Sequence, residues 1–259
     1  MRKIKELIKD ILYCLTSLAP HRQGVAVLMY HSVDNNPIDF NVKPNEFFRQ
    51  MAYLHKKNYK IISVEELVEI LESGRSFNKK TVVLTFDDGF KDNYTSVFPL
   101  LKKYNFKATI FITTSFIGKQ INNSYNLPLD VLSWEQIKEM HNSGLVDFQP
   151  HSATHPKLAQ ISEKELEKEI KESKEILEKE LSKKCYFSAY PKGNYNNKVI
   201  EEFKKQNFKA VFTIHPGLIR VGDSAFELKR NFINSSPFFS RFRSITKGII
   251  LKKWWKKIK

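Results

Sequence analysis

The chain has 259 residues, 41% of them hydrophobic and 13% aromatic, and these fractions exclude a disordered or low-complexity protein. Its two cysteines, Cys14 and Cys185, are too few and too far apart for a disulfide framework. The formal net charge of +15 is unevenly placed, because every charged residue from position 229 to 259 is basic. Such a tail indicates an anionic partner or a solvated surface. No nucleic-acid-binding module is recognisable, which argues against nucleic acid as the partner.

The first 23 residues predict an amphipathic helix rather than a signal peptide. Its expected apolar face consists of Ile4, Leu7, Ile8, Ile11, Leu12 and Leu15. Glu6 and Asp10 interrupt what would be a positive leader, and the apolar run is shorter than the roughly 20 residues that cross a bilayer. We therefore expect no transmembrane span here, and a cytoplasmic location is favoured over export.

From residue 24 onward, short apolar runs alternate with helical patterns. Strands are predicted at 24–30, 59–62, 81–86, 107–113, 145–149, 186–190 and 210–213. Helices are predicted at 45–57, 63–71, 92–104, 133–144, 162–182 and 197–206, with capping boxes at Ser63/Glu66 and Ser162/Glu165. The alternation predicts one parallel α/β domain over 24–233, and about seven strands predict a distorted (β/α)7-type barrel.

The C-terminal tail, residues 234–259, mixes aromatic and aliphatic side chains with basic ones. Tryptophan suits a membrane interface, and lysines attract anionic headgroups at about 1 kcal/mol each. In a helix, Ile250, Trp254 and Ile258 would align on one side. The tail therefore predicts docking on an anionic membrane surface, at its cytoplasmic face. The alternative is that the aromatic side chains pack back on the barrel.

Two acidic residues lie at the carboxyl end of the predicted strand 81–86, where parallel barrels place their active sites. Asp87 and Asp88 belong to the run T-F-D-D-G-F. Adjacent side chains on an extended backbone point in opposite directions, unless the chain turns there, as Gly89 permits. Because D-D-G is also common turn chemistry, this motif alone favours a simple turn over a site.

Two histidines follow the predicted strand 145–149 in H-S-A-T-H-P, residues 151–156. His151 and His155 can converge on one metal ion, and a carboxylate from another strand completes a set of two histidines and one aspartate. Such a set leaves positions open for water and substrate. The aspartate pair at a second strand end makes a chance pair of histidines a weaker explanation.

Three further strand ends carry candidate residues. His31 follows the strand 24–30 in L-M-Y-H, and His215 follows the strand 210–213 in T-I-H-P-G. In the run A-Y-P-K-G, a proline and a glycine bracket Lys192, so that a backbone N–H could face the site from a fixed turn.

These motifs together resemble those of the NodB-homology polysaccharide deacetylases, carbohydrate esterase family four, over about residues 24–233. The chain is most similar to the branch that acts on poly-N-acetylglucosamine, whose members begin with an L-x-Y-H strand. The resemblance implies a metal-dependent hydrolase that removes an acetyl, formyl or similar small acyl group from an amino-sugar glycan. A catalytically inactive carbohydrate-binding member of the same fold is the alternative.

The resemblance also implies residue roles. Asp87 is the implied general base, and the implied ligands of zinc or a similar divalent ion are Asp88, His151 and His155. The general acid is implied to be His31, with His215 as the alternative.

The third family motif differs in this chain. The family has R-x-P-Y-G, whereas this chain has Ala189, Tyr190, Pro191, Lys192 and Gly193. Tyr190, Pro191 and Lys192 are implied to contact the substrate or its oxyanion, and only the Lys192 N–H is needed for the oxyanion. The family arginine that pairs with the base is absent, and Arg230 in E-L-K-R-N is the candidate substitute.

Overall fold

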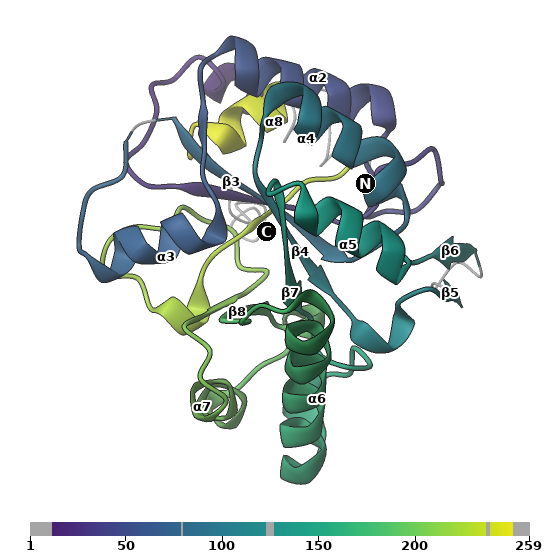
Figure 1. The fold of residues 1–259 in the computed structure, drawn as a ribbon. Coiled ribbons are helices and arrows are strands. Elements are labelled where there is room, and N and C mark those ends of the chain that lie inside the picture. Colours follow the sequence, from purple (N-terminus) through teal and green to yellow (C-terminus); the bar gives the residue numbers. More distant parts are fainter. Residues whose placement is uncertain (1–11, 79, 123–126, 237–238, 251–259) are drawn as a thin grey trace, which may run out of the picture.

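The computed structural model describes residues 12–78, 80–122, 127–236 and 239–250, and Figure 1 shows their arrangement. Five strands form the central parallel sheet in the order β10-β1-β3-β4-β7. They are β1 (Ala26–Tyr30), β3 (Thr81–Asp88), β4 (Ala108–Ile112), β7 (Val146–Pro150) and β10 (Asn231–Phe232). A short strand, β2 (Lys60–Ile61), also pairs with β3 in parallel.

Two further strands continue the barrel as a separate parallel pair. β8 (Phe187–Ala189) pairs with β9 (Ala210–Phe212). Side chains link β8 to β7: the Phe187 N–H donates to Gln149 Oε1, and Ser188 Oγ donates to the Pro150 carbonyl. All seven predicted strands are present, which confirms the distorted (β/α)7-type barrel.

Helices surround the strands, with α2, α4 and α8 together on one side and α6 and α7 at the other (Figure 1). They are α2 (Pro44–Lys56), α3 (Val64–Glu72), α4 (Phe98–Tyr104), α5 (Trp134–Asn142), α6 (Glu163–Leu181), α7 (Asn197–Lys205) and α8 (Phe239–Thr246). Among the described residues, none of these helices is both long and apolar enough to cross a membrane.

The helix starts follow from local side-chain chemistry, with two corrections. Ser162 and Glu165 form the expected capping box of α6. At α3 only half of the expected box is present, because Ser63 accepts from the Glu66 N–H while the Glu66 carboxylate pairs with Lys60. The expected helix 92–104 begins instead as a π-helix, Asn93–Val97, that continues into α4.

Alternate side chains of the strands pack into two clusters. On one face, Leu28 and Leu84 join the α2 residues Phe47 and Met51, and all four are fully buried. The opposite face contains a second cluster with members from β1, β3, α3, β8 and β9. The apolar strands are therefore buried on both faces, as is usual for parallel sheets, and their polar ends are left to form the site.

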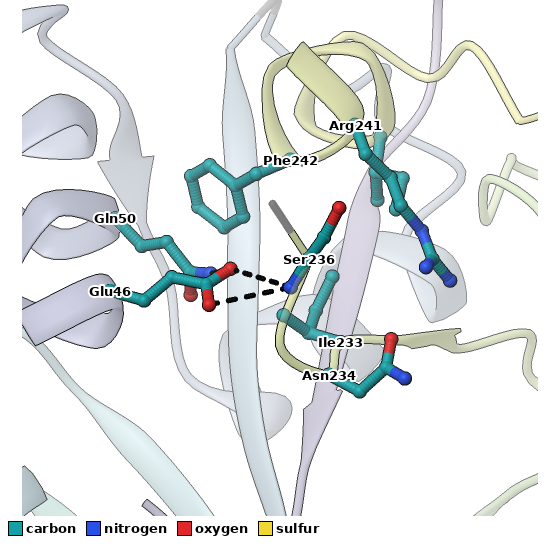
Figure 2. A pocket seen from close by; sticks show the side chains of 8 residues that line it. Glu46, Gln50, Ile233, Asn234, Ser236, Arg241 and Phe242 are labelled. Atoms are coloured by element: carbon teal, nitrogen blue, oxygen red, sulfur yellow. Dashed lines mark hydrogen bonds between the residues drawn. The ribbon is translucent and has the colours of Figure 1, made fainter. Parts of the chain in front are cut away.

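Part of the C-terminal tail packs on the barrel. Phe242 and Ile249 are 4% and 5% exposed, and Phe242 contacts the Tyr53 ring of α2. Figure 2 shows how the connection to α8 is fixed: the Glu46 carboxylate accepts hydrogen bonds from the Ser236 N–H. The alternative of inward packing therefore holds for Phe242, and Ile249 is buried with it. The expected alignment of Ile250 with Trp254 and Ile258 falls mostly outside the described residues.

The N-terminal segment packs against α8. Residues 12–16 are helical, and residues 1–11 of the expected amphipathic helix lie outside the described residues. Ser244 Oγ donates to the Tyr13 carbonyl, and Lys247 Nζ donates to the carbonyls of Ser17 and Ala19. Leu15 and Leu18 remain 67% and 83% exposed on this segment.

Candidate active site

The two aspartates at the end of β3 face one site because the chain turns between them. Asp88 has a φ of 71° and Gly89 a φ of 73°, both in the left-handed region. The expected opposite orientation applies only to an extended backbone, so this turn overrides it. Gly89 is required for a second reason, since a Cβ there would lie 2.6 Å from the Ile112 side chain.

Asp88 meets the two histidines that follow β7. Asp88 Oδ1 lies 3.5 Å from His155 Nε2 and 4.0 Å from His151 Nε2, and the three groups can offer ligand atoms within 4.8 Å of one another. Ligands on a tetrahedral ion at 2.0–2.2 Å are roughly 3.4 Å apart, so the Asp88–His155 spacing matches such an ion and the Asp88–His151 spacing is somewhat wider. The structure thus brings together the three residues predicted to hold a metal.

The surroundings of the histidines also suit metal binding. Burial lowers the pKa of His151 to about 3 and that of His155 to about 4, so both rings are neutral near pH 7. His151 Nδ1 lies 2.8 Å from the Ala189 carbonyl, the partner that fixes a ring whose Nε2 is a ligand. Burial raises the pKa of Asp88 to about 6, with His31 opposing the rise and Asp87 adding to it.

A carboxylate on α6 fixes the loop between the two histidines. Glu169 accepts from the Thr154 N–H at 2.8 Å and from Thr154 Oγ1 at 2.6 Å. Two residues of this loop, Ser152 and His155, have positive φ values of 65° and 61°. Left-handed conformations cost free energy in residues other than glycine, so the contacts with α6 have to stabilise them. The sequence patterns did not identify Glu169, because its partner lies in a loop whose path the sequence does not reveal.

Asp87 forms a buried ion pair with Arg230. The guanidinium donates to both carboxylate oxygens, with Nη1–Oδ1 at 2.6 Å and Nη2–Oδ2 at 2.8 Å. Arg230 is 0% exposed, and its Nε donates to the Thr213 carbonyl. Burial would raise the pKa of Asp87, but the charges of Arg230, His151 and His31 and the hydrogen bonds from Arg230 together lower this pKa to about 2. Arg230 therefore occupies the pairing position that the missing arginine leaves open.

The two candidate acids differ in position. His31 is close enough to both Asp87 and Asp88 to favour their ionised forms. His215 is exposed, its ring lies 6.0 Å from that of Tyr195, and it is not among the main groups that shift the pKa of Asp87 or Asp88. The arrangement therefore favours His31 as the histidine that serves this site.

The residues of the turn 189–193 differ in burial and in hydrogen bonding. Lys192 has a φ of 57°, and no described residue accepts a hydrogen bond from its N–H. The Tyr190 side chain is fully buried, and its hydroxyl donates to the Phe226 carbonyl. The expectation that Tyr190 contacts a substrate is therefore not supported for its side chain, and Pro191 is buried beside it.

The cavity drawn in Figure 2 is not part of this site. It lies between α2 and α8, is lined by Glu46, Gln50 and Phe242, and encloses only about 10 Å³. That is room for one water molecule at most.

A parallel barrel with an Asp–His–His set and an arginine-paired aspartate at its strand ends defines a hydrolase of the metal-dependent type. The chain belongs to the polysaccharide deacetylase family, whose family model matches residues 74–211.

Named relatives and solved structures agree with this assignment. The chain is 30% identical over 208 residues to a poly-β-1,6-N-acetyl-D-glucosamine N-deacetylase of Staphylococcus epidermidis, covering 77% of this chain and 70% of the relative. The deacetylase PplD of Streptococcus pyogenes, solved with acetate, is 30% identical with a TM-score of 0.75, over 89% of this chain and 99% of that one. IcaB of Ammonifex degensii has a TM-score of 0.78 at 26% identity, over 88% and 99% of the two chains.

Proposed function

We propose that this protein is a metal-dependent N-deacetylase that removes an acetyl or similar small acyl group from an amino sugar in a glycan. The observation that carries the proposal is the contiguity of two groups: an aspartate held ionised by Arg230, and an adjacent aspartate within reach of two neutral histidines. An inactive carbohydrate-binding protein would not need this full set of residues. The name of the staphylococcal relative suggests a poly-β-1,6-N-acetylglucosamine chain as the first substrate to test.

Asp88, His151 and His155 would hold the ion, and we propose zinc because two imidazoles and one carboxylate are typical catalytic zinc ligands. When bound, such an ion supplies a Lewis acid for the acyl carbonyl and lowers the pKa of water towards about 7.

The other residues divide the proton transfers between them. Asp87, ionised at neutral pH, accepts the proton of the attacking water. The Lys192 N–H donates to the oxyanion that develops, a contact worth about 3 kcal/mol in comparable sites. His31 then protonates the amide nitrogen, which can leave as a neutral amine but not as an amide anion. A histidine suits this step because its ordinary pKa lies near neutral pH.

The test is release of acetate and of formate from N-acylated amino-sugar oligosaccharides by the full-length protein with added zinc. Asp87→Asn should retain bound zinc and lose roughly 10²–10⁴ in rate, because the base lies beside the ligands. His31→Ala should lose a similar factor, whereas His215→Ala should be mild. A zinc-loaded wild-type protein that releases neither acid from any substrate would favour the inactive alternative.

We also propose that the protein docks on the cytoplasmic face of a membrane. Leu15 and Leu18 support this, since both are exposed on a segment whose Ser17 and Ala19 carbonyls accept hydrogen bonds from Lys247. The charges of Arg243, Lys57 and Lys80 act on this lysine. Apolar side chains next to cations suit a surface of anionic lipid.

Flotation with liposomes tests the docking. Binding should require anionic lipid, weaken with salt, and fall in the double variant Leu15→Ser/Leu18→Ser. Equal recovery of the wild type with and without anionic liposomes at low salt would remove this proposal.

A further inference from the structure

Asp92 links the loop after β3 to the loop after β1. It lies four residues beyond Asp88, at the end of the turn that leaves the metal set. Its Oδ2 accepts from Ser32 Oγ at 2.7 Å, and its Oδ1 accepts from the Val33 N–H at 2.8 Å. These two partners directly follow His31, so the carboxylate holds the backbone on the C-terminal side of that histidine.

Asn93 extends the contact to His31 itself. Its Nδ2 donates to the His31 carbonyl at 3.0 Å and to Asp92 Oδ1 at 2.9 Å. Asn93 and Ser32 are both fully buried. Hydrogen bonds to a carboxylate are roughly twice as strong as neutral ones, and burial removes the competition of water. The two residues therefore bind three consecutive residues, 31–33, through the His31 carbonyl, the Ser32 hydroxyl and the Val33 N–H.

The His31 ring has little else to orient it by hydrogen bonding. Its Nδ1 is buried and has no hydrogen-bond partner within the described ranges. The Phe40 and Phe232 rings lie beside it, with centroids 5.6 and 5.7 Å away. The first contact is tilted and the second is edge-on, and neither fixes the ring as a hydrogen bond would. The position of the ring is therefore determined mainly by the backbone that Asp92 and Asn93 hold.

We infer that Asp92, together with Asn93, is a positioning residue that holds His31 at the distance from Asp87 and Asp88 needed for protonating the leaving group. This rests on the proposed role of His31 as general acid. We call Asp92 and Asn93 the clamp. The clamp and the base Asp87 belong to the same segment, 87–93, so this segment sets the geometry of both proton transfers. Misplacing a catalytic group by about 1 Å can cost roughly 100-fold in rate.

The experiment compares two substrates of the zinc-loaded full-length protein. An N-acetylglucosamine oligosaccharide needs its nitrogen protonated before the C–N bond breaks, whereas 4-nitrophenyl acetate loses a stable phenolate without an acid. Asp92→Ala should lower kcat on the oligosaccharide by about 10–100-fold with KM and zinc content little changed. Hydrolysis of the ester should fall far less.

Companion variants keep the test decisive. Asp92→Asn preserves an oxygen for the Val33 N–H and can donate to Ser32 Oγ, so it should restore most of the oligosaccharide activity. Ser32→Ala removes one bond only and should show the same selectivity with a smaller loss, which covers the case that Asp92→Ala fails to fold. Asp130→Asn is the matched control, because this carboxylate pairs with the neighbouring Lys91 at an exposed position.

The His31→Ala variant separates the two hypotheses. Selective loss of oligosaccharide activity in His31→Ala, with no further loss in His31→Ala/Asp92→Ala, is the expected result, because residues acting as a unit are non-additive. Asp92→Ala and Ser32→Ala could instead lower the activity on both substrates equally, or on neither, while His31→Ala is selective. The positioning role of Asp92 would then be wrong, and the assignment of His31 as the acid would stand. If His31→Ala itself is not selective, the acid assignment fails.

Discussion

The guanidinium of Arg230 lies over two adjacent aromatic rings as well as against Asp87. Its central carbon is 5.4 Å from the Phe111 ring centroid and 6.0 Å from that of Phe212. Both its charge and that of Asp87 are removed from water, a cost that only a well-formed pair offsets. The two fork hydrogen bonds meet that requirement, and they leave Asp87 ionised at any pH at which the protein would work.

Removing the arginine should therefore destabilise the fold as well as the reaction. Arg230→Ala leaves a buried carboxylate without a partner, and we expect a loss of about 3–5 kcal/mol in the free energy of unfolding. Urea unfolding of the metal-free protein measures it. The control is Lys229→Ala, which breaks the partly exposed pair with Asp223 and should cost no more than about 1 kcal/mol. Equal effects of the two variants would show that the buried pair contributes little.

The site residues differ in how far sequence could identify them. Asp88, His151 and His155 were predictable because ligand types recur at the ends of parallel strands. Arg230 could be named as a candidate only because the third family motif has Ala189 in place of its arginine. Asp92 could not be recognised: it belongs to a short polar run, and its partners Ser32 and Val33 are contributed by another strand end, about sixty residues away in the chain.

Asp92 also gives a pH dependence of stability. Burial raises its pKa from 3.8 to about 6, although hydrogen bonds from Val33, Ser32 and Asn93 oppose the rise, and the nearby Asp34 carboxylate adds to it. Between these two pH values the folded protein keeps a proton that the unfolded chain has lost. The contribution to stability is therefore complete below about pH 3.8 and is lost as the pH rises through about 6.

Asn at position 92 binds no proton, so it lacks this contribution. We expect the free energy of unfolding of the wild type, minus that of Asp92→Asn, to fall by up to about 3 kcal/mol between pH 4 and pH 7. Urea unfolding of both metal-free proteins at several pH values gives the difference, in which the other titrating groups cancel. A difference that is flat, or that rises with pH, would contradict the raised pKa.

At the scale of elements, sequence patterns identified long or strongly periodic segments best. Helix α6 has nineteen residues, a capping box and one apolar face, and its bounds were predicted to within a residue. Three short strands were missed: β10 has two residues, and the hairpin of β5 (Gln120–Asn122) and β6 (Pro128–Asp130) has three in each strand. The equally short β2, β8 and β9 were predicted because each belongs to a longer strand-like run in the sequence, whereas tertiary contacts decide the conformation of the missed strands.

Helix α6 should act on the metal site through Glu169. Glu169→Ala removes both contacts with Thr154, so the left-handed residues of the histidine loop lose their support, and zinc affinity should fall about tenfold. Competition with a chromogenic chelator measures the affinity. Glu172→Ala on the same helix breaks only an exposed pair with Lys168 and should change it little. If circular dichroism shows less helix in Glu169→Ala than in Glu172→Ala, the loss of zinc affinity comes from damage to α6 itself. Equal zinc affinity in the two variants would contradict the role of Glu169.

At the scale of the whole molecule, the proposed metal ligands connect strands that are not neighbours. Asp88 ends β3 and the histidines follow β7, while β4 lies between these two strands in the sheet. The donor set therefore spans the carboxyl-terminal edge of the sheet. The loop that carries the two histidines is also hydrogen-bonded to α6. A ligand that binds only when these elements are assembled favours the folded state of the entire barrel.

Metal removal should consequently lower the thermal midpoint. At a free zinc concentration of 100 times Kd, binding adds about 2.7 kcal/mol, which corresponds to a rise of roughly 5–10 °C for a chain of this length. Differential scanning calorimetry of chelated and zinc-loaded protein measures the rise. Asp88→Asn should abolish it, whereas Asp87→Asn should retain it, each variant being compared with its own chelated form because loss of Asp87 also leaves Arg230 unpaired. A zinc-dependent rise that survives in Asp88→Asn would place the ion elsewhere, and a loss in both variants would mean that Asp87 and Asp88 bind it jointly.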